Sequence, residues 1–468
     1  MVSGLDRKVS LAYSYNGFDN TAFLSGDNRI DSLLVGFDWT GTLHQGASVS
    51  YSFQGSPDAA FVNDFNYALQ TWANIANVHF NYIPSSSAAA ANAQILAVED
   101  TSLVSQGELG VTYPTFAGTQ ITNAEVHVDP NDPNKPAANP QADIIMTMIH
   151  EMGHALGLKH PENYGGDADG LQPFLPFAAG NNDYTVMAYD YGNYANAANP
   201  AETPMLYDVL AMQYLYGANT GYNAGNTVYN ITGALTTQAI WDAGGVNQFN
   251  TTGYGGNVSL DLRQGGVSTV GQSNYFVSYN THIQQALTGS GNDSIIANNA
   301  GDFISSGQGN DSITGGAGND TISTGKGDDI IHSGSGPADI NGNMGNDTII
   351  GGSGSSLLQG GQGNDSITGG SGHDTISGNL GNNTMTGVSG ANIFLFNNFN
   401  GPIGQDVITD FHPGSDKIEF NSAIFATSAA ALSAVDASAI IHISGGGTIA
   451  LQGVMQSQLT QNDFLIVG

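Results

Sequence analysis

A nine-residue repeat occupies residues 288–395 and constrains the fold more than any other feature of the sequence. One clean copy, GGAGNDTIS, spans residues 315–323, and twelve units follow one another without slippage. Glycines permit a tight turn in each unit, an aspartate stands at the sixth position of most units, and an apolar residue stands at the eighth. This pattern predicts a parallel β-roll with a narrow apolar core, because a disordered linker would not keep an apolar residue in register.

The turns of the repeat also predict calcium binding. Most turns combine inward-facing carbonyls with an aspartate, and Ca²⁺ prefers sites made of oxygen ligands alone. The resulting ligand set is Gly289, Gly291, Asp293, Asp302, Gly307, Gly309, Asp311, Gly316, Gly318, Asp320, Asp329, Asp347, Asp365 and Asp374.

The two sides of the predicted roll carry different side chains. A coil of two repeats places turns 18 residues apart on the same side, so the first side stacks Asp293, Asp311, Asp329, Asp347 and Asp365. The second side reads Asp302, Asp320, Ala338, Ser356, Asp374 and Asn392. We expect about four well-occupied calcium ions on the first side and a sparser, weaker set on the second.

Composition agrees with a cation as the counter-charge. Eight Lys and Arg stand against 40 Asp and Glu, a formal net charge of -32, which excludes nucleic acid and an anionic membrane as natural partners. There is no cysteine, so bound metal would have to stabilise an extracellular fold. The first eight residues lack the apolar core of a secretory signal, and no apolar run is long enough to span a bilayer.

The segment HEMGHALGLKH, which begins at residue 150, predicts a zinc site. His150 and His154 are four residues apart and share one face of a helix, so both imidazoles can reach one cation. Gly157 can take the left-handed conformation that ends the helix and returns His160 as a third ligand. Three protein nitrogens leave one zinc position open, which indicates catalysis. Glu151 points elsewhere and can act as a base on a metal-bound water.

A second segment, YTVMAY over residues 184–189, completes a pattern typical of one protein class. Met187 can form an apolar floor under the imidazoles, and Tyr189 follows two residues later. The motif HExxHxxGxxH with this methionine resembles the metzincins, and Met187-x-Tyr189 is similar to the serralysin branch of secreted bacterial zinc endopeptidases. The resemblance implies that Glu151 is the general base and that Tyr189 is a further ligand able to leave the metal and stabilise the tetrahedral intermediate. It implies zinc ligation by His150, His154 and His160.

The remaining pattern before residue 220 predicts an α+β domain, which the resemblance implies is the metzincin catalytic domain. Strands are expected at Ile30–Phe37, Ala47–Phe53, Val78–Tyr82, Ile95–Val98, Gly110–Tyr113 and Glu125–Asp129. Helices are expected from Pro57 with Ser56 as cap, from Pro140 with Asn139 as cap, and from Thr203-Pro204 to Gly217. By resemblance, Gly110–Tyr113 is the edge strand that pairs with an extended substrate. An ordinary sheet edge is about as good an explanation.

The resemblance extends to the end of the chain. The predicted organisation is a zinc metalloprotease domain at 1–220, a junction at 221–287, an all-β parallel RTX β-roll at 288–395, and a β cap at 396–468. Asp406–Ile418 is similar to the segment that caps RTX arrays, and Asp463–Gly468 resembles the tail read by type I secretion. Asn226 and Asn247 stand where relatives place acidic calcium ligands, which argues against calcium at the junction.

Together these features predict a monomeric, secreted, calcium-stabilised zinc endopeptidase that acts on extracellular proteins or peptides. Without calcium the stacked carboxylates should repel one another, so the roll is expected to be unfolded in the cytosol and to fold after leaving through type I secretion machinery. One alternative is an RTX binding or surface protein with a degenerate protease domain, against which the intact Glu151 argues. Another is a zinc hydrolase of a different substrate class, for which casein would remain uncut.

Overall fold

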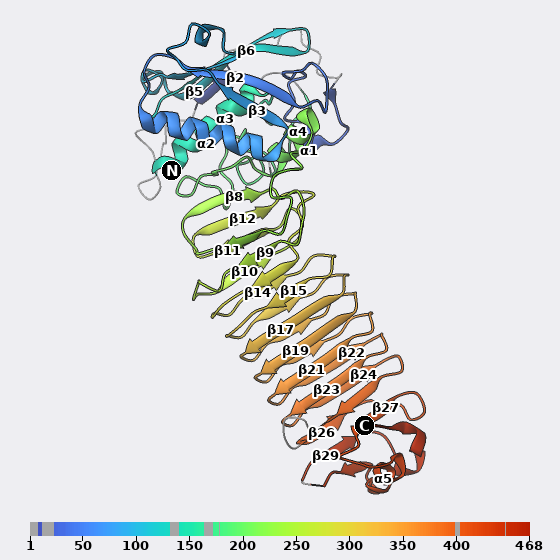
Figure 1. Cartoon of the computed structure of the whole chain (residues 1–468). Coiled ribbons are helices and arrows are strands. Elements are labelled where there is room, and N and C mark those ends of the chain that lie inside the picture. The colour runs from blue at the N-terminus through green and yellow to red at the C-terminus, as the bar shows by residue number, and fades with distance from the viewer. Residues whose placement is uncertain are drawn as a thin grey trace. The chain divides into compact units, whose positions relative to one another are not determined.

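The computed structural model describes residues 8–11, 23–131, 140–162, 172–176, 178–397, 403–444 and 446–468. The protein divides into two compact units, whose elements are labelled in Figure 1. The first comprises Met1–Gly225, Ala234–Gly245 and Gln272–Thr281, and the second comprises Asn226–Gly233, Val246–Gly271 and His282–Gly468. Each unit contains its own buried apolar side chains and therefore its own core.

The first unit is built on a six-stranded sheet with the order β1-β5-β6-β4-β2-β3. β5 and β6 are antiparallel, and the other neighbouring strands are parallel. The strands are β1 (Lys8–Leu11), β2 (Ala47–Phe53), β3 (Val78–Tyr82), β4 (Ile95–Glu99), β5 (Glu108–Ala117) and β6 (Gln120–Val128), and β8 (Thr236–Ile240) runs parallel to β12 (Ser273–Val277). The helices are α1 (Asn28–Asp31), α2 (Ala59–Ile75), α3 (Pro140–Ala155) and α4 (Leu206–Tyr216), with short 3-10 turns at Ala90–Asn92 and Val104–Gln106.

An apolar face of α2 packs against α3. Its buried side chains recur at helical spacing and include Phe61, Phe65, Leu69 and Trp72. The indole nitrogen of Trp72 donates to the carbonyl of Ile149 on α3 at 3.1 Å, which ties the two helices together. The N-cap of α2 is Asp58, whose carboxylate accepts the Ala60 amide, so the predicted cap at Ser56 is wrong by two residues.

The apolar run predicted as a strand at Ile30–Phe37 is not a strand. Asp27 caps the short helix α1 by accepting the Arg29 amide, and turns follow it. Leu33, Leu34 and Phe37 are nevertheless buried. A short apolar run indicates burial but cannot by itself distinguish a strand from a buried turn.

The other predicted elements of this unit are found close to their expected positions. β2, β3, β4 and β6 confirm four predicted strands, and α3 begins at Pro140 as expected. The predicted cap of α3, Asn139, lies outside the described residues. α4 begins at Leu206 rather than at Thr203, because the Asp208 carboxylate accepts the Met205 amide at 2.8 Å and makes that residue the N-cap; the helix ends at Gly217 as predicted.

The expectation that Gly110–Tyr113 forms a sheet edge is wrong. These residues belong to β5, and β1 pairs with the outer side of β5, with Lys8 opposite Glu108 and Leu11 opposite Thr112. An uncovered strand edge leaves backbone N–H and C=O groups unpaired, and here β1 pairs with those groups of β5.

The second unit is a β-roll made of two long sheets. The strand order is β28-β29-β26-β24-β22-β20-β18-β16-β14-β10-β11 in one and β30-β27-β25-β23-β21-β19-β17-β15-β13-β9-β7 in the other. The strands of the first are β10 (Val258–Asp261), β11 (Val267–Val270), β14 (Ser294–Ile296), β16 (Ser312–Thr314), β18 (Ile330–His332), β20 (Thr348–Ile350), β22 (Ser366–Gly370), β24 (Thr384–Val388), β26 (Gln405–Ile408), β28 (Ile440–His442) and β29 (Thr448–Leu451). Those of the second are β7 (Val228–Asn230), β9 (Gln248–Asn250), β13 (Gln285–Leu287), β15 (Phe303–Ser305), β17 (Asp320–Lys326), β19 (Ala338–Met344), β21 (Leu357–Gln362), β23 (Thr375–Leu380), β25 (Ile393–Phe396), β27 (Lys417–Asn421) and β30 (Phe464–Val467). The unit also contains α5 (Ser428–Ser433) and 3-10 turns at Gln456–Gln458 and Gln461–Asp463.

The register of the roll confirms a coil of two repeats. Ser294 pairs in parallel with Ser312, and Ser312 with Ile330, a step of 18 residues. The eighth-position side chains form the core between the sheets, with Ile313, Ile322 and Ile331 no more than 1 % exposed. Coils approach closely at the glycines of the turns: a Cβ on Gly309 would lie 1.8 Å from the carbonyl oxygen of Gly291.

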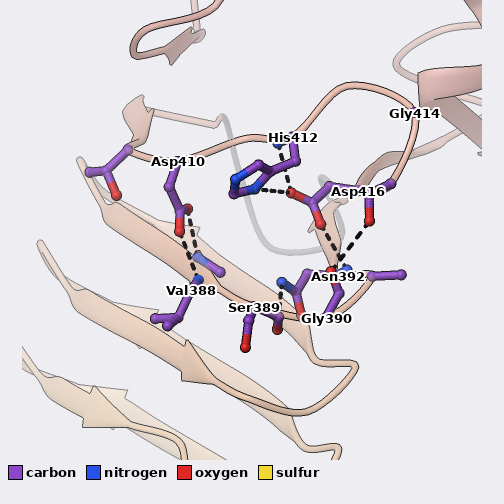
Figure 2. A network of polar contacts seen from close by, with 12 residues as sticks. Val388, Ser389, Gly390, Asn392, Asp410, His412, Gly414 and Asp416 are labelled. Atoms are coloured by element: carbon purple, nitrogen blue, oxygen red, sulfur yellow. Dashed lines mark hydrogen bonds and ion pairs between the residues drawn. The ribbon is translucent and has the colours of Figure 1, made fainter.

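The regular array ends where aspartates of the following segment bind its last turns (Figure 2). The Asp410 carboxylate accepts the amides of Gly387 and Val388, and Asp416 accepts those of Asn392 and His412. The pairing step also lengthens, because Thr384 pairs with Val407, 23 residues later. The segment after the repeats therefore closes the turns that another repeat would otherwise cover.

Among the described residues, no helix is long and apolar enough to cross a membrane.

Candidate metal centre

The three motif histidines converge in the first unit. His150 and His154 lie on α3, and the backbone of Gly157 takes the left-handed conformation at φ 101°. A Cβ at Gly157 would lie 2.4 Å from the Phe37 carbonyl oxygen, so glycine is required both for the turn and for this close approach. The turn brings the Nε2 atom of His160 to 3.3 Å from Nε2 of His150 and 3.1 Å from Nε2 of His154.

Hydrogen bonds on the far side of two rings orient the imidazoles. Nδ1 of His150 lies 2.7 Å from the Val186 carbonyl oxygen, and Nδ1 of His154 lies 2.9 Å from that of Leu158. A carbonyl can only accept, so each Nδ1 carries the proton and each Nε2 presents a lone pair. Burial, reinforced by the neighbouring imidazoles, lowers the pKa of His154 and His160 well below the usual histidine range, which keeps both rings neutral.

This geometry fits a tetrahedral zinc ion. Zinc binds histidine nitrogen at about 2.0–2.1 Å, which places two nitrogens of a tetrahedron about 3.3 Å apart. The Nε2 separations of 3.1 and 3.3 Å agree with that spacing. Within the described part of the chain, this is the one group of three or more His, Asp or Glu side chains whose ligand atoms lie within 4.8 Å of one another.

Glu151 is buried beside the cluster and is held by β5. Its Oε2 accepts a hydrogen bond from the Thr112 hydroxyl at 2.5 Å, and its Oε1 is buried with no hydrogen-bond partner among the described residues. Burial raises the pKa of Glu151 well above its usual value, the Thr112 hydrogen bond opposes that rise, and the charge of Glu108 adds to it. The arrangement leaves one carboxylate oxygen free to take up a proton.

The predicted turn at residues 184–189, called the Met-turn after Met187, lies against the same helix α3. Met187 is fully buried, and a Cβ on Gly153 of α3 would lie 2.4 Å from its sulfur. The carboxylate of Asp208 on α4 accepts bonds from the Thr185 hydroxyl at 2.5 Å and the Val186 amide at 2.7 Å. Asp208 thereby fixes the turn to α4, and burial raises the pKa of this carboxyl to about 7.

Tyr189, which the family resemblance implies as a further ligand, lies beside the imidazole cluster. Its ring centroid lies 4.5 Å from that of His160 and 6.0 Å from that of His150, and it is stacked on the latter with an interplanar angle of 17°. The phenol is therefore adjacent to two of the three rings.

Four residues that support this centre were not identified from the sequence: Gly110, Thr112, Gly153 and Asp208. Only Gly153 left a local signal, because a glycine inside a helix costs about 1 kcal/mol relative to alanine and so indicates a close approach. The others act through contacts between distant segments.

On the first side of the roll, the sixth-position aspartates form a continuous ladder. The amide of Asp293 donates to Oδ1 of Asp311 at 2.9 Å, and the same bond links Asp311 to Asp329, Asp329 to Asp347, and Asp347 to Asp365 at 2.7–2.9 Å. In all five the other oxygen, Oδ2, is buried without a hydrogen-bond partner among the described residues. Buried unpaired carboxylate oxygens are costly, and a row of them has the chemistry of a Ca²⁺ site.

The second side is interrupted. The Asp302 amide donates to Asp320 at 2.9 Å, but the Ala338 amide then donates to the Ser356 hydroxyl at 3.1 Å. Asp320 has both oxygens engaged by amides, from Asp302 and Gly316. Of this side, Asp302 and Asp374 retain a buried oxygen without a partner.

The predicted glycine ligands lie in the turns between these aspartates. The carbonyls of Gly289, Gly307 and Gly316 each accept an amide of the following coil. A carbonyl oxygen has a second lone pair, which stays available to a cation.

At the junction, the side-chain amides of Asn226 and Asn247 make hydrogen bonds at the places where relatives have acidic residues. Asn226 accepts the Val246 amide at 2.9 Å, and Asn247 accepts the Thr227 amide at 3.1 Å. The side-chain nitrogen of Asn247 donates to the His282 carbonyl at 3.0 Å.

Comparison with known proteins agrees with both units. Residues 211–461 match the family model described as the C-terminal part of M10 serralysin peptidases, and residues 42–166 match the matrixin model. The chain is 36 % identical over 176 residues to a serralysin of Proteus mirabilis, covering 33 % of this chain and 35 % of the relative. It is 29 % identical over 264 residues to serralysin C of Dickeya chrysanthemi, covering 51 % of this chain and 54 % of the relative. It is 30 % identical over 297 residues to serralysin A of the same organism, covering 55 % of this chain and 60 % of the relative. The matches span about a third to three fifths of these relatives.

A matrixin domain with three clustered imidazoles and a buried methionine against the helix that carries two of them defines the metzincin class. With the parallel β-roll that follows, the chain belongs to the serralysin family of M10 peptidases.

Proposed function

We propose that this protein is a secreted, calcium-stabilised zinc endopeptidase that hydrolyses peptide bonds of extracellular proteins. The observation that carries the proposal is the convergence of three imidazoles, in which Nε2 of His160 lies 3.3 Å from that of His150 and 3.1 Å from that of His154. Beside them lies a buried carboxylate whose Oε1 has no hydrogen-bond partner among the described residues. Relatives named serralysin support the same reading.

The proposed roles follow from the position of each side chain. His150, His154 and His160 would hold the zinc ion, which supplies Lewis-acid polarisation when bound. Glu151 would accept a proton at its carboxylate as general base. Tyr189 would be a further ligand that can leave the metal and donate a hydrogen bond to the oxygen that becomes negative during attack on the peptide carbonyl.

The wider assignments are proposals of the same kind. We place the catalytic domain at 1–220, the junction at 221–287, the calcium-binding roll at 288–395 and the cap with its secretion tail at 396–468. The acidic chain would stay unfolded in its roll until it meets extracellular calcium, leave through type I secretion machinery, and act as a monomer.

Casein zymography together with metal analysis tests the activity. We expect one zinc per chain, clearing of casein, and loss of clearing after chelation that zinc and calcium restore. A zinc-loaded protein that leaves casein intact would favour a hydrolase of another substrate class, and a protein without zinc would favour an RTX binding protein with a degenerate protease domain.

Tyr189→Phe is expected to retain zinc and to lower kcat roughly 10²-fold with a smaller change in KM, because the lost hydroxyl acts on the transition state. Steady-state kinetics on a casein-derived peptide measures this. Tyr191→Phe, two residues further on, is the control and should behave as the wild type. An unchanged kcat in Tyr189→Phe would show that the family role does not carry over to this residue.

Calcium occupancy is expected to differ between the two sides of the roll. The first side offers the five-aspartate ladder with its unpaired Oδ2 atoms, whereas Ala338 and Ser356 interrupt the second. An anomalous-scattering map at limiting calcium should show about four strong sites on the first side and weaker ones on the second. Equal occupancy, or stronger peaks beside Ala338 and Ser356, would refute the asymmetry.

A further inference from the structure

The strand β5 makes two contacts with Glu151 that the assigned roles do not use. Gly110 and Thr112 are two residues apart, so they present the same face of the strand. Both meet the Glu151 side chain of α3, about 40 residues later in the chain.

The first contact is a short hydrogen bond. Thr112 is fully buried, and its Oγ1 lies 2.5 Å from Oε2 of Glu151 and 3.0 Å from the Glu151 carbonyl oxygen. A hydroxyl has one proton to donate. The proton goes to the carboxylate, because that oxygen is closer than the carbonyl oxygen and accepts more strongly. Hydrogen bonds from hydroxyl groups to ionised oxygens are about 2.5–2.7 Å long.

The second contact is a space that only glycine leaves. A Cβ built on Gly110 would lie 2.7 Å from both Cγ and Oε1 of Glu151. The φ of Gly110 is not in the left-handed region, so the backbone itself does not require glycine. The lack of a side chain at Gly110 therefore serves the placement of Glu151.

We propose that Gly110 and Thr112 are positioning residues for the general base, a role that rests on the proposed function. The Thr112 hydroxyl holds Oε2, and the space over Gly110 admits Oε1, so the side chain keeps one orientation. Oε1 is then the oxygen left without a hydrogen-bond partner in the described structure and available for the proton. A strand of the sheet thus sets the direction in which the carboxylate acts.

Thr112→Val tests the hydrogen bond, with Thr112→Ser as the conservative partner. Val keeps the shape of the side chain but cannot donate, and we expect kcat on a casein-derived fluorogenic peptide to fall about 10- to 100-fold, the loss typical of a misplaced catalytic group. KM, zinc content and the melting temperature should stay close to those of the wild type. Thr112→Ser retains the hydroxyl and should restore most of kcat.

Thr115→Val is the matched control on the same strand. Thr115 is exposed and its hydroxyl pairs with that of Thr122 at 3.0 Å, away from Glu151. It should keep the wild-type kcat and KM.

Gly110→Ala tests the second contact and keeps the inference falsifiable if Thr112→Val fails to fold. Its methyl group should displace Glu151 and lower kcat without loss of zinc. The inference is overturned if Thr112→Val keeps wild-type kcat, if Ser and Val lose kcat equally, or if the loss follows loss of zinc. A wild-type protein that does not cleave the peptide would instead refute the proposed function, so the two failures are distinguishable.

Discussion

Glu151→Gln is expected to bind a full equivalent of zinc, while its kcat falls about 10²–10⁴-fold. The substitution keeps the size and shape of the side chain, and the amide oxygen can still accept the Thr112 hydrogen bond. It removes the group that takes up a proton. The three imidazoles keep their Nδ1 bonds to backbone carbonyls, so the proposed ligand geometry should not change.

The same substitution should not weaken the fold. Burial raises the pKa of Glu151, which means that the folded protein already disfavours the ionised carboxylate. A neutral amide removes that cost, so we expect the melting temperature to stay the same or to rise. Metal analysis, calorimetry and peptide kinetics on one preparation measure all three quantities.

The matched control is Glu125→Gln on β6, where the carboxylate is half exposed and lies 3.6 Å from His127. This variant should retain full activity. Retained proteolysis in Glu151→Gln at near the wild-type rate, or loss of stoichiometric zinc, would contradict the assignment of Glu151 as the base outside the ligand set.

Removal of calcium is expected to unfold the roll at pH 8 and to affect it far less at pH 4–5. Without the cation, the ladder buries carboxylate oxygens that have no hydrogen-bond partner among the described residues. Burial raises the pKa of Asp302 and Asp347 to about 7, and that of Asp311, Asp365 and Asp406 to about 6.

The sign of the pH effect follows from these shifts. The folded pKa values lie above the ordinary aspartate value of 3.8, so the calcium-free roll binds more protons than the unfolded chain. The stability that these bound protons give to the calcium-free roll is fully present below pH 3.8 and is lost as the pH rises through 6–7. Calcium replaces those protons at neutral pH.

Hydrogen exchange followed by mass spectrometry on metal-free protein measures this effect strand by strand. We expect peptides covering β14–β24 to exchange rapidly at pH 8 after correction for intrinsic rates, and to be protected at pH 5 or on addition of Ca²⁺. Equal protection of the calcium-free roll at both pH values, or lower protection at pH 5, would contradict the argument.

Much of the protein follows from local sequence pattern. The repeat determines the roll, because an apolar residue in every ninth position fixes the register and the glycines fix the turns; the step of 18 residues appears as predicted. The spacing of His150, His154 and His160, with Gly157 between, brings three imidazoles together. These features depend on residues only a few positions apart, where helix period and turn geometry leave few alternatives.

Contacts between distant segments decided the rest. The apolar run at Ile30–Phe37 forms a short helix end and turns instead of a strand. Its backbone is determined by the Asp27 cap and by burial of its side chains, and its periodicity does not reveal this. β5 lost its expected edge because β1 pairs with it. Asp208 holds the Met-turn from another helix, and Thr112 holds Glu151 from another strand. A hydrogen bond between residues 22 or 39 positions apart leaves no periodic trace in the sequence, because only the folded chain brings donor and acceptor together.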